Sequence, residues 1–233
     1  GERRVSAWRD RAGRAIDFDP ARLAARLGGG AVEILRIAGG QSNPTYFVTH
    51  DGREMVLRKP PSGEILPSAH QVDREYRVMA ALADTDVPVP RMILLETDPE
   101  AIGTPFYLME RLEGRVVHDS ALPDLSPEDR RAAWRDAAAT LARLHAVDWK
   151  AAGLEGFGRE GGYFGRQIAR WTKQWTLSRT REDANVETVA AWLAENVPQD
   201  DATAVVHGDY RIGNLMFALD APRVVGVLDW ELS

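Results

Sequence analysis

The sequence predicts an α+β protein with a small β-rich part over residues 1–112 and a mainly helical part over residues 113–233. A chain of this length can bury one large core or form two lobes. Most of residues 32–112 consists of short apolar and β-branched runs separated by glycine, proline and aspartate, the pattern of strands joined by turns. Residues 126–195 instead carry apolar side chains at helical spacing. We therefore place the boundary between these two parts near residue 112, where the pattern changes.

The composition limits the possible classes of function. The chain has 233 residues, 44% of them hydrophobic and 27% charged, as in ordinary globular proteins. A net charge of -6 argues against a nucleic-acid partner, because such binding relies on Lys and Arg neutralising phosphates. The absence of cysteine excludes disulfides, thiolate catalysis and zinc–thiolate sites. No apolar run approaches the length of a membrane span, so we expect no membrane partner and a cytoplasmic location.

Residues 1–30 are predicted to form a helical extension of the small β-rich part. Apolar residues such as Trp8 and Leu23 recur among Arg and Ala in an amphipathic pattern. Asp19-Pro20 is typical of a helix start, because Asp caps the first N–H groups and Pro fits the first helical position. The three glycines at 28–30 end this helix, and we expect no chemistry from it.

A glycine-rich segment separates the first two strands of the predicted sheet. Strands over residues 32–35 and 45–49 flank it, and Asp51-Gly52 indicates a hairpin turn into a third strand over residues 54–59. Glycine lets backbone N–H groups approach phosphate oxygens without a Cβ in the way, although a plain turn is the alternative. The candidate phosphate-binding residues are Gly39, Gly40, Gln41, Ser42 and Asn43.

The middle of the chain predicts one helix, two strands and a long helix. Residues 69–82 place apolar side chains on one helical stripe, and strands are expected over residues 91–95 and 105–110. Ser126-Pro127 then begins a helix that extends to about His145, because Ser is a good N-cap and Pro fits the first turn.

Two further helices are expected over residues 164–175 and 185–195. Two interpretations of this helix pair stay open. Its tryptophans could form a satellite core between the helices, or the pair could wall an acceptor pocket with the basic residues of the first helix facing an anionic substrate. The tryptophans are Trp171, Trp175 and Trp192.

The last thirty residues carry the strongest chemical pattern. Val205-Val206 predicts a strand that leads into a polar loop holding Asp209 and Asn214, and a second β-rich run over residues 224–228 ends in Asp229. Phosphoryl transfer needs a carboxylate that orients and deprotonates a hydroxyl, together with an amide and a carboxylate that hold Mg²⁺. These three side chains supply that set, although a polar hairpin stabilised by Asp and Asn is the alternative.

The same residues resemble the aminoglycoside phosphotransferase and choline kinase group of protein-kinase-like enzymes. His207-Gly208-Asp209 with Asn214 matches the H-G-D-x-x-x-x-N loop of that group, and Leu228-Asp229-Trp230-Glu231 matches its (I/L)-D-(W/F) motif. The resemblance implies a two-lobe protein-kinase-like fold with ATP and Mg²⁺ as cofactors. It also implies that Asp209 is the catalytic base and that Asn214 and Asp229 are metal ligands.

The resemblance also implies a cation on the third strand that contacts the phosphates and pairs with a glutamate. Arg58 stands where the family usually has lysine, with Lys59 beside it, and Glu75 of the next helix is its expected partner. Only one of the two cations can face the nucleotide, because side chains alternate across a strand. We favour Arg58 and keep Lys59 as the alternative. Backbone groups of Glu110 and Leu112, in the segment that joins the lobes, are the expected contacts of the adenine.

Three further segments resemble one branch of this family, the kinase-like domain that some organisms fuse to acyl-CoA dehydrogenase domains. They are Leu57-Arg58-Lys59-Pro60-Pro61, Arg74-Glu75-Tyr76 and Phe164-Gly165-Arg166-Gln167. This resemblance implies that the acceptor is a hydroxy acid or a hydroxyacyl thioester of coenzyme A, rather than an antibiotic.

The predicted function is therefore ATP- and Mg²⁺-dependent phosphorylation of a hydroxyl on a small molecule. The alternatives are a catalytically weak, nucleotide-binding regulatory module and an aminoglycoside phosphotransferase. A protein kinase is disfavoured because no activation-loop sequence follows Asp229. Family members continue well beyond this motif, so we expect the helical lobe to be incomplete here and to be covered by a C-terminal continuation or a partner.

Overall fold

The computed structural model describes residues 8–37, 43–61, 69–158, 160–198 and 202–233. The chain divides into two compact units. The first holds residues 1–153 and 205–233, and the second holds residues 154–204. The predicted lobe boundary near residue 112 therefore falls inside the first unit.

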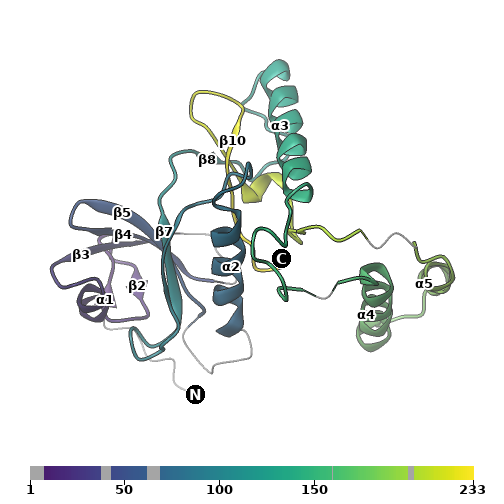
Figure 1. Cartoon of the computed structure of the whole chain (residues 1–233), viewed down its shortest axis with the longest axis horizontal. Helices are drawn as coiled ribbons and strands as arrows, with labels where there is room; N and C mark the ends of the chain where they lie inside the picture. Colours follow the sequence, from purple (N-terminus) through teal and green to yellow (C-terminus); the bar gives the residue numbers. More distant parts are fainter. Residues whose placement is uncertain (1–7, 38–42, 62–68, 159, 199–201) are drawn as a thin grey trace. The chain divides into compact units, whose positions relative to one another are not determined.

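The first unit contains a five-stranded antiparallel sheet with the strand order β3-β4-β5-β7-β6 (Figure 1). The turn between β4 and β5 lies at Asp51-Gly52, where both residues have the positive φ angles, 49° and 73°, that a two-residue hairpin turn requires. The sheet confirms the strands expected in this part of the chain. Its strands are β3 (Val32–Arg36), β4 (Thr45–His50), β5 (Arg53–Arg58), β6 (Met92–Glu96) and β7 (Phe106–Glu110).

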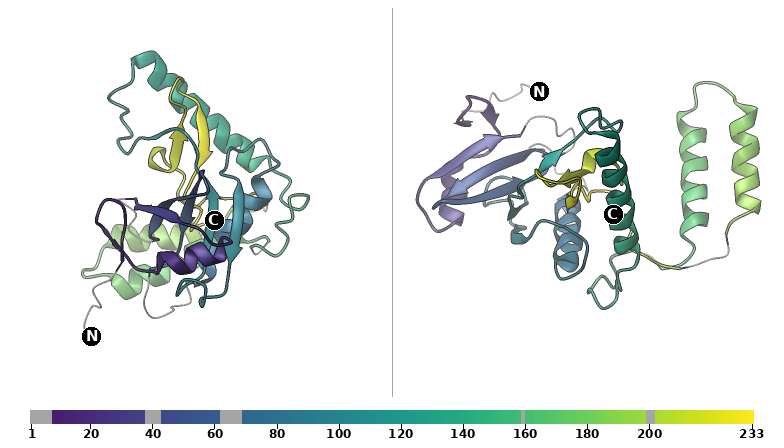
Figure 2. Two further views of the ribbon diagram at one scale, coloured as in Figure 1. Left: turned by 90° about the vertical axis from the view of Figure 1, so that its left-hand side faces the viewer. Right: turned by 90° about the horizontal axis from the view of Figure 1, so that it is seen from above.

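Different segments cover the two faces of this sheet. Figures 1 and 2 show them as the N-terminal segment, residues 8–26, and the helix α2 (Ala69–Leu82). Leu57 and Leu108 lie on the face that forms the hydrophobic core with the N-terminal segment. Their sequence neighbours Arg58 and Tyr107 lie on the opposite face, because side chains alternate along a strand. The helix α2 (Ala69–Leu82) packs on that second face against β6 and β7. Polar side chains of α2 can therefore reach Arg58.

The helical extension expected for residues 1–30 is wrong over residues 8–16, and residues 1–7 lie outside the described residues. Trp8–Arg9 (β1) and Ala15–Ile16 (β2) form an antiparallel ribbon. The carboxylate of Asp10 closes the ribbon by accepting two backbone N–H groups at 2.9 and 2.8 Å. The extended chain brings Ile16 and Phe18, two residues apart, to the same buried core. Burial of this i, i+2 pair favours an extended chain here, although the local sequence pattern is that of an amphipathic helix.

The second half of that segment follows the prediction. The helix α1 spans Pro20–Arg26, and the Asp19 side chain accepts the N–H of Ala21 at 2.9 Å as its N-cap. The chain then leaves the helix through Gly28, whose φ of 103° suits glycine.

A smaller antiparallel sheet with the order β10-β9-β8 carries the C-terminal residues. Its strands are β8 (Arg115–Val116), β9 (Leu215–Phe217) and β10 (Val224–Val227), and the 3₁₀-helix Ile212–Asn214 precedes β9. The strands expected after Asn214 and before Asp229 are confirmed. The strand expected at residues 205–206 is wrong, because these residues pair with no neighbouring strand among those described.

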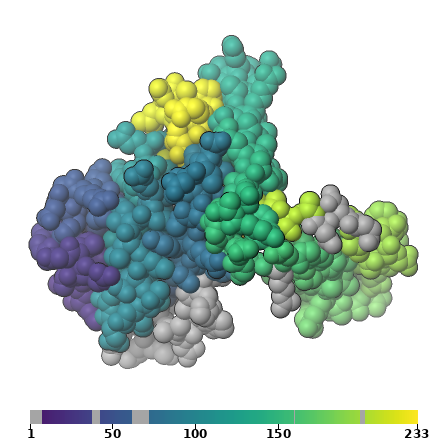
Figure 3. Space-filling model, in the orientation of Figure 1, coloured from purple at the N-terminus to yellow at the C-terminus, as the bar shows by residue number. Residues whose placement is uncertain are grey.

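The long helix α3 (Pro127–His145) supports this smaller sheet, and the two lie against each other in Figure 3. Ser126 caps the helix by accepting the N–H of Asp129 at 3.1 Å, as expected. Asp136 accepts the N–H of Val224 at 2.6 Å, and the Tyr210 hydroxyl donates to the Ala137 carbonyl at 2.6 Å. These bonds tie both β10 and the loop before β9 to one face of α3.

The second unit is a helix pair, α4 (Tyr163–Ser178) and α5 (Ala184–Glu195). The two helices pack on each other, but neither buries a side chain completely. Trp171 and Trp192 remain 60% and 59% exposed, so the interpretation as a satellite core is wrong for these two, whereas Trp175 is half-buried. No helix in the described part of the chain is long and apolar enough to cross a membrane.

Gly114, directly before β8, lies very close to β9. A Cβ at this position would lie 2.5 Å from the Met216 Cγ and 2.7 Å from the backbone oxygen of Phe217. We predict that Gly114→Ala lowers the free energy of unfolding by about 1–3 kcal/mol, because backbone atoms must move to admit the methyl group.

Chemical denaturation of the purified variant would measure this loss. Gly165→Ala is the matched control, because Gly165 lies in α4 and a Cβ there meets no atom within 4 Å. It should leave stability unchanged or raise it by about 0.5–1 kcal/mol, since alanine favours a helix over glycine. Equal stability of the two variants would contradict the close approach at Gly114.

Candidate functional site

The loop between residues 207 and 214 is held by its own polar side chains. The Asn214 Nδ2 donates to both the backbone oxygen and the Oδ2 of Asp209, each at 2.9 Å. The Arg211 Nε donates to the same Oδ2 at 3.1 Å. Burial opposes ionisation of Asp209, but these two donors outweigh it and lower the pKa of Asp209. The carboxylate is therefore charged at neutral pH, and its Oδ1 is not used by these bonds.

His207 attaches this loop to the residue before Asp229. Its Nδ1 accepts the N–H of Asp209 at 3.2 Å, so its Nε2 carries the proton and donates to the Leu228 oxygen at 2.9 Å. Burial lowers the pKa of His207, and the ring packs against the Trp230 ring with centroids 4.6 Å apart and the planes tilted by 47°. The neutral imidazole thus has a structural role in the site.

A second hydrogen bond, from the backbone N–H of Leu228, also attaches the residue before Asp229 to this loop. The Leu228 N–H donates to the backbone oxygen of Asn214 at 2.9 Å, so both polar backbone groups of Leu228 are bound to the loop. Asp229 follows with a φ of 65°, in the left-handed region that Asp adopts more readily than most residues. These two bonds hold Leu228, the residue before Asp229, to the loop that carries Asp209 and Asn214.

The oxygen donors at this point fit Mg²⁺ that is already bound to a nucleotide. Within the described ranges, no three His, Cys, Asp or Glu side chains are grouped so that they could hold a metal ion. Asn214 uses its amide nitrogen in the loop, which leaves its oxygen for a cation, and Asp229 adds a carboxylate. Mg²⁺ in nucleotide sites takes one or two protein carboxylates and completes its shell with phosphate oxygens and water. This set matches that requirement.

Arg58 connects the large sheet to Asp229. Its Nη2 bonds to Asp229 Oδ1 and lies 3.5 Å from Glu231 Oε2, and its Nε lies 3.2 Å from Glu75 Oε2. The structure therefore brings the predicted pair Arg58 and Glu75 together, and it places both beside the predicted metal ligand. Nη1 of Arg58 takes no part in these three contacts and is available to a phosphate.

Lys59 points to the opposite face of the sheet. Its side chain is completely buried, and its Nζ donates to Asp17 Oδ2 and to the Pro60 oxygen, both at 2.7 Å. The Tyr46 hydroxyl donates to the other oxygen of Asp17 at 2.8 Å. Arg58 and Lys59 thus face opposite sides of the sheet, and Lys59 lies with the N-terminal segment, away from Glu75 and Asp229.

The remaining predicted nucleotide-binding residues are placed less completely. Gly39, Gly40, Gln41 and Ser42 lie outside the described residues, and Asn43 donates to Glu75 at 3.1 Å. Glu110 ends β7, where its side chain accepts the N–H of Arg91 at 2.9 Å. The Leu112 side chain lies so close to β10 that a Cβ on Gly226 would be 2.5 Å from it. The segment that joins the lobes therefore runs beside the strand that leads to Asp229.

Two residues of this site were missed by the sequence reasoning. The Tyr107 hydroxyl donates to Glu75 Oε2 at 2.8 Å from a fully buried position, and Arg211 holds Asp209. Strand alternation could have indicated Tyr107, because it shares a face with neither Phe106 nor Leu108, which are apolar. No sequence signal identified its partner.

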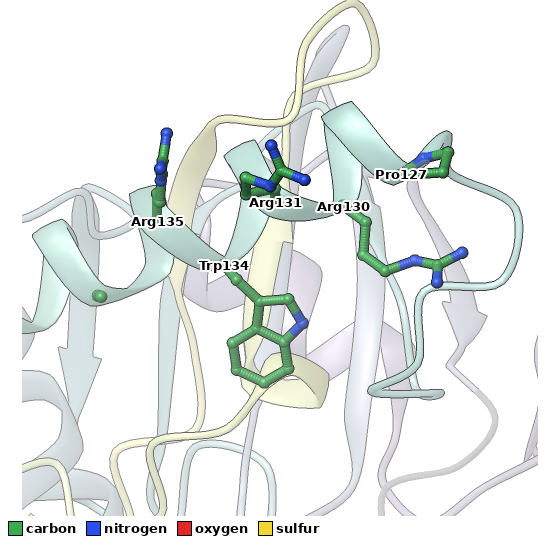
Figure 4. Close-up of a pocket in the computed structure, with 6 residues that line it drawn as sticks. Pro127, Arg130, Arg131, Trp134 and Arg135 are labelled. Atoms are coloured by element: carbon green, nitrogen blue, oxygen red, sulfur yellow. The ribbon is translucent and has the colours of Figure 1, made fainter.

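Two hollows lie outside this site. One, of about 450 Å³, lies on the face of α3 that carries Trp134, but Figure 4 shows the Trp134 indole pointing away from the guanidinium groups of Arg131 and Arg135. The other, of about 460 Å³, lies between α4 and α5 and is lined mostly by apolar side chains. Neither hollow contains Asp209, Asn214 or Asp229.

Comparison with known sequences shows the family of the chain. A sequence model of the phosphotransferase enzyme family matches residues 33–233. Acyl-CoA dehydrogenase family member 10 of Mus musculus is 45% identical over 204 residues, which are 88% of this chain and 19% of the mouse protein. The chain thus spans about a fifth of the length of that relative. The match also confirms the resemblance to the branch fused to acyl-CoA dehydrogenases.

Solved structures confirm the fold class. A crystal structure from Ralstonia eutropha, provisionally described as an aminoglycoside phosphotransferase, is 43% identical with a TM-score of 0.83 and covers 92% of this chain and 65% of its own. The GDP and kanamycin complex of APH(2″)-IIIa has a TM-score of 0.69 at 15% identity, covering 91% of this chain and 71% of its own. At that identity the second likeness shows the fold alone.

The buried Glu75 gives a prediction for the pH dependence of stability. Burial raises the pKa of Glu75 from an ordinary 4.5 to about 7, although Arg58 and Tyr107 act in the opposite direction. A raised folded-state pKa means that the folded protein binds the proton more tightly than the unfolded chain. The resulting stabilisation is complete below the unfolded pKa and is lost as the pH rises through about 7.

We therefore predict that the stability of the parent protein relative to Glu75→Gln decreases between about pH 5 and about pH 8. Glutamine keeps the shape and the acceptor oxygen but cannot titrate, so the variant serves as the baseline for the parent protein. Denaturant unfolding of both proteins at several pH values measures the difference. A difference that stays constant, or that grows with pH, would contradict a raised pKa.

Proposed function

Because the chain belongs to the phosphotransferase enzyme family, we propose that it transfers the γ-phosphoryl group of ATP to a hydroxyl of a small molecule. One observation supports this proposal: the N–H of Leu228 bonds to the backbone oxygen of Asn214 and its carbonyl accepts a bond from His207, so Asp229 directly follows a residue that is held to the loop of Asp209 and Asn214. A regulatory module without catalysis would not require all three side chains in this arrangement. The arrangement favours an enzyme.

Asp209 acts on the acceptor hydroxyl in this proposal. Its lowered pKa keeps it ionised, and its Oδ1 is left free of the bonds that hold Oδ2. The carboxylate orients the hydroxyl and accepts its proton as the oxygen attacks the γ-phosphorus. The bonds from Asn214 and Arg211 keep the side chain in one rotamer, so little reorganisation is needed during the reaction.

The phosphates are held by the other side of the site. Asn214 and Asp229 would hold Mg²⁺, which when bound neutralises charge on the phosphates. Arg58 is kept in position by Glu75 and would contact the phosphates through its Nη1. Lys59 takes no part, since its charge is paired with Asp17 on the other face.

The acceptor we propose is a hydroxy acid or a hydroxyacyl thioester of coenzyme A. The support is the 45% identity to a mouse protein named as an acyl-CoA dehydrogenase family member, compared with 15% to the kanamycin complex. An aminoglycoside is the second candidate, because the 43% identical Ralstonia structure is provisionally described as an aminoglycoside phosphotransferase.

ADP release from Mg-ATP tests both candidates, with hydroxy acids, their coenzyme A thioesters and kanamycin as acceptors. We expect turnover with a member of the first two groups. Asp209→Asn should reduce that turnover by about 10²–10⁴-fold while nucleotide binding persists, because the amide cannot accept the proton. Turnover with kanamycin but with none of the other compounds would show that the acceptor is an aminoglycoside and would contradict the proposed acceptor. Near-normal turnover by Asp209→Asn would remove Asp209 from the role of base.

Arg58 and Lys59 provide a second prediction, because they are adjacent cations that face opposite sides of the sheet. Arg58→Ala should raise the KM for ATP by about tenfold or more, through loss of a phosphate contact. Lys59→Ala should mainly lower stability by about 2–4 kcal/mol, because Asp17 loses its buried partner. Steady-state kinetics and thermal unfolding of both variants measure the contrast. A larger rise in KM for Lys59→Ala would reverse the assignment.

A further inference from the structure

Glu75 is a buried carboxylate bound by donors from three separate elements. Its side chain has no exposed surface, and burying such a charge is costly unless it is paired and hydrogen-bonded. Arg58 of β5 forms an ion pair with Oε2 at 3.2 Å, the Tyr107 hydroxyl of β7 donates to Oε2 at 2.8 Å, and Asn43 donates to Oε1 at 3.1 Å. Each oxygen of Glu75 therefore has a neutral donor, and one of them also faces the guanidinium group.

The strand register explains why Tyr107 reaches the same oxygen as Arg58. Tyr107 is the direct partner of Arg58 across the β5–β7 ladder, so both side chains leave the sheet side by side on the face covered by α2. Tyr107 is almost completely buried. Its hydroxyl thus limits where the Glu75 carboxylate can lie, and so limits where Arg58 can lie.

Asn43 makes the corresponding contact from the segment that enters β4. Its side chain is buried, and its backbone oxygen accepts the Thr45 hydroxyl at 3.1 Å. The start of β4 is therefore joined to α2 through the Asn43–Glu75 bond. This use of the Asn43 amide differs from the phosphate contact expected from the sequence.

We propose that Tyr107 and Asn43 are positioning residues of the nucleotide site, which hold Glu75 so that Arg58 is fixed in the orientation that binds phosphate. The inference rests on the proposed function, since it assigns these residues to the same nucleotide site. Neither residue touches the nucleotide in this account, and both act through Glu75.

Tyr107→Phe tests the proposal, with Tyr46→Phe as a matched control. Both tyrosines are buried in neighbouring parts of one sheet, and each donates to a carboxylate at 2.8 Å, but Tyr46 binds Asp17 on the opposite face. Tyr107→Phe should raise the dissociation constant of a non-hydrolysable ATP analogue with Mg²⁺, and the KM for ATP, by about tenfold, with kcat changed less than about threefold. Tyr46→Phe should lower thermal stability and leave both constants within about twofold of the parent.

A double-mutant cycle separates positioning from general destabilisation. In the Glu75→Ala background, Tyr107→Phe and Asn43→Ala should no longer change the affinity for the ATP analogue, because both act through the missing carboxylate. Tyr46→Phe should have the same small effect in both backgrounds. Asn43→Ala in the parent background provides the second variant if Tyr107→Phe fails to fold.

Equal effects of Tyr107→Phe and Tyr46→Phe on nucleotide affinity would overturn the proposal, as would additive effects in the Glu75→Ala background. These results would leave the proposed function standing if Arg58→Ala still weakens nucleotide binding. Unchanged nucleotide affinity in Arg58→Ala would instead overturn the nucleotide site itself, and with it the positioning role.

Discussion

The pairing of the buried Arg58 charge is the interaction on which the first unit depends. A guanidinium group that is largely removed from water must have acidic partners, or the fold loses several kcal/mol. Glu75 from α2 and Asp229 from the C-terminal segment both supply that charge, and Asp229 lies 171 positions from Arg58 in the sequence. The ion pairs therefore bring the sheet, the helix and the end of the chain to one point. The same requirement assembles the candidate site.

Main-chain bonds decide how accurately that site is assembled. Leu228 is fixed to the loop by its N–H and its carbonyl, and Gly208 lies so close to Leu232 that a Cβ would be 2.4 Å from its oxygen. Gly208 also has a φ of 84°, which only glycine adopts without strain. The carboxylates of Asp209 and Asp229 are thus carried by backbone that has little freedom to move. Catalysis by positioned charges benefits from such preorganisation.

Two adjacent cations show how one strand serves two purposes. Arg58 ends β5 and Lys59 follows it, and their side chains lie on opposite faces of the sheet. Arg58 meets the acidic groups of the site, and Lys59 binds Asp17 of the N-terminal segment. The ribbon and α1 thereby cover the core face of the sheet, and the side chain of Lys59 is buried. The segment before β3 thus stabilises the sheet by packing on its core face, and α2 covers the opposite face, from which Arg58 projects.

The sequence alone determined the features that depend on short-range pattern. Strand alternation, the caps at Asp19 and Ser126 and the Asp51-Gly52 turn predicted most elements within a few residues, because each depends on neighbouring side chains. The spacing of Asp209, Asn214 and Asp229 also indicated the chemistry. Residues 8–16 departed from their helical pattern, since burial of Ile16 and Phe18 in a distant core outweighs local periodicity.

Only the tertiary structure decided which of Arg58 and Lys59 faces the acidic groups. The choice depends on strand register and on partners many residues away, and a sequence pattern with a period of two fits either face. Tyr107 and the contact of Asn43 with Glu75 were undetectable for the same reason, because they exist only once α2 lies on the sheet. The chemical groups of the site are thus encoded locally. Their mutual contacts arise from packing between elements that are distant in the chain.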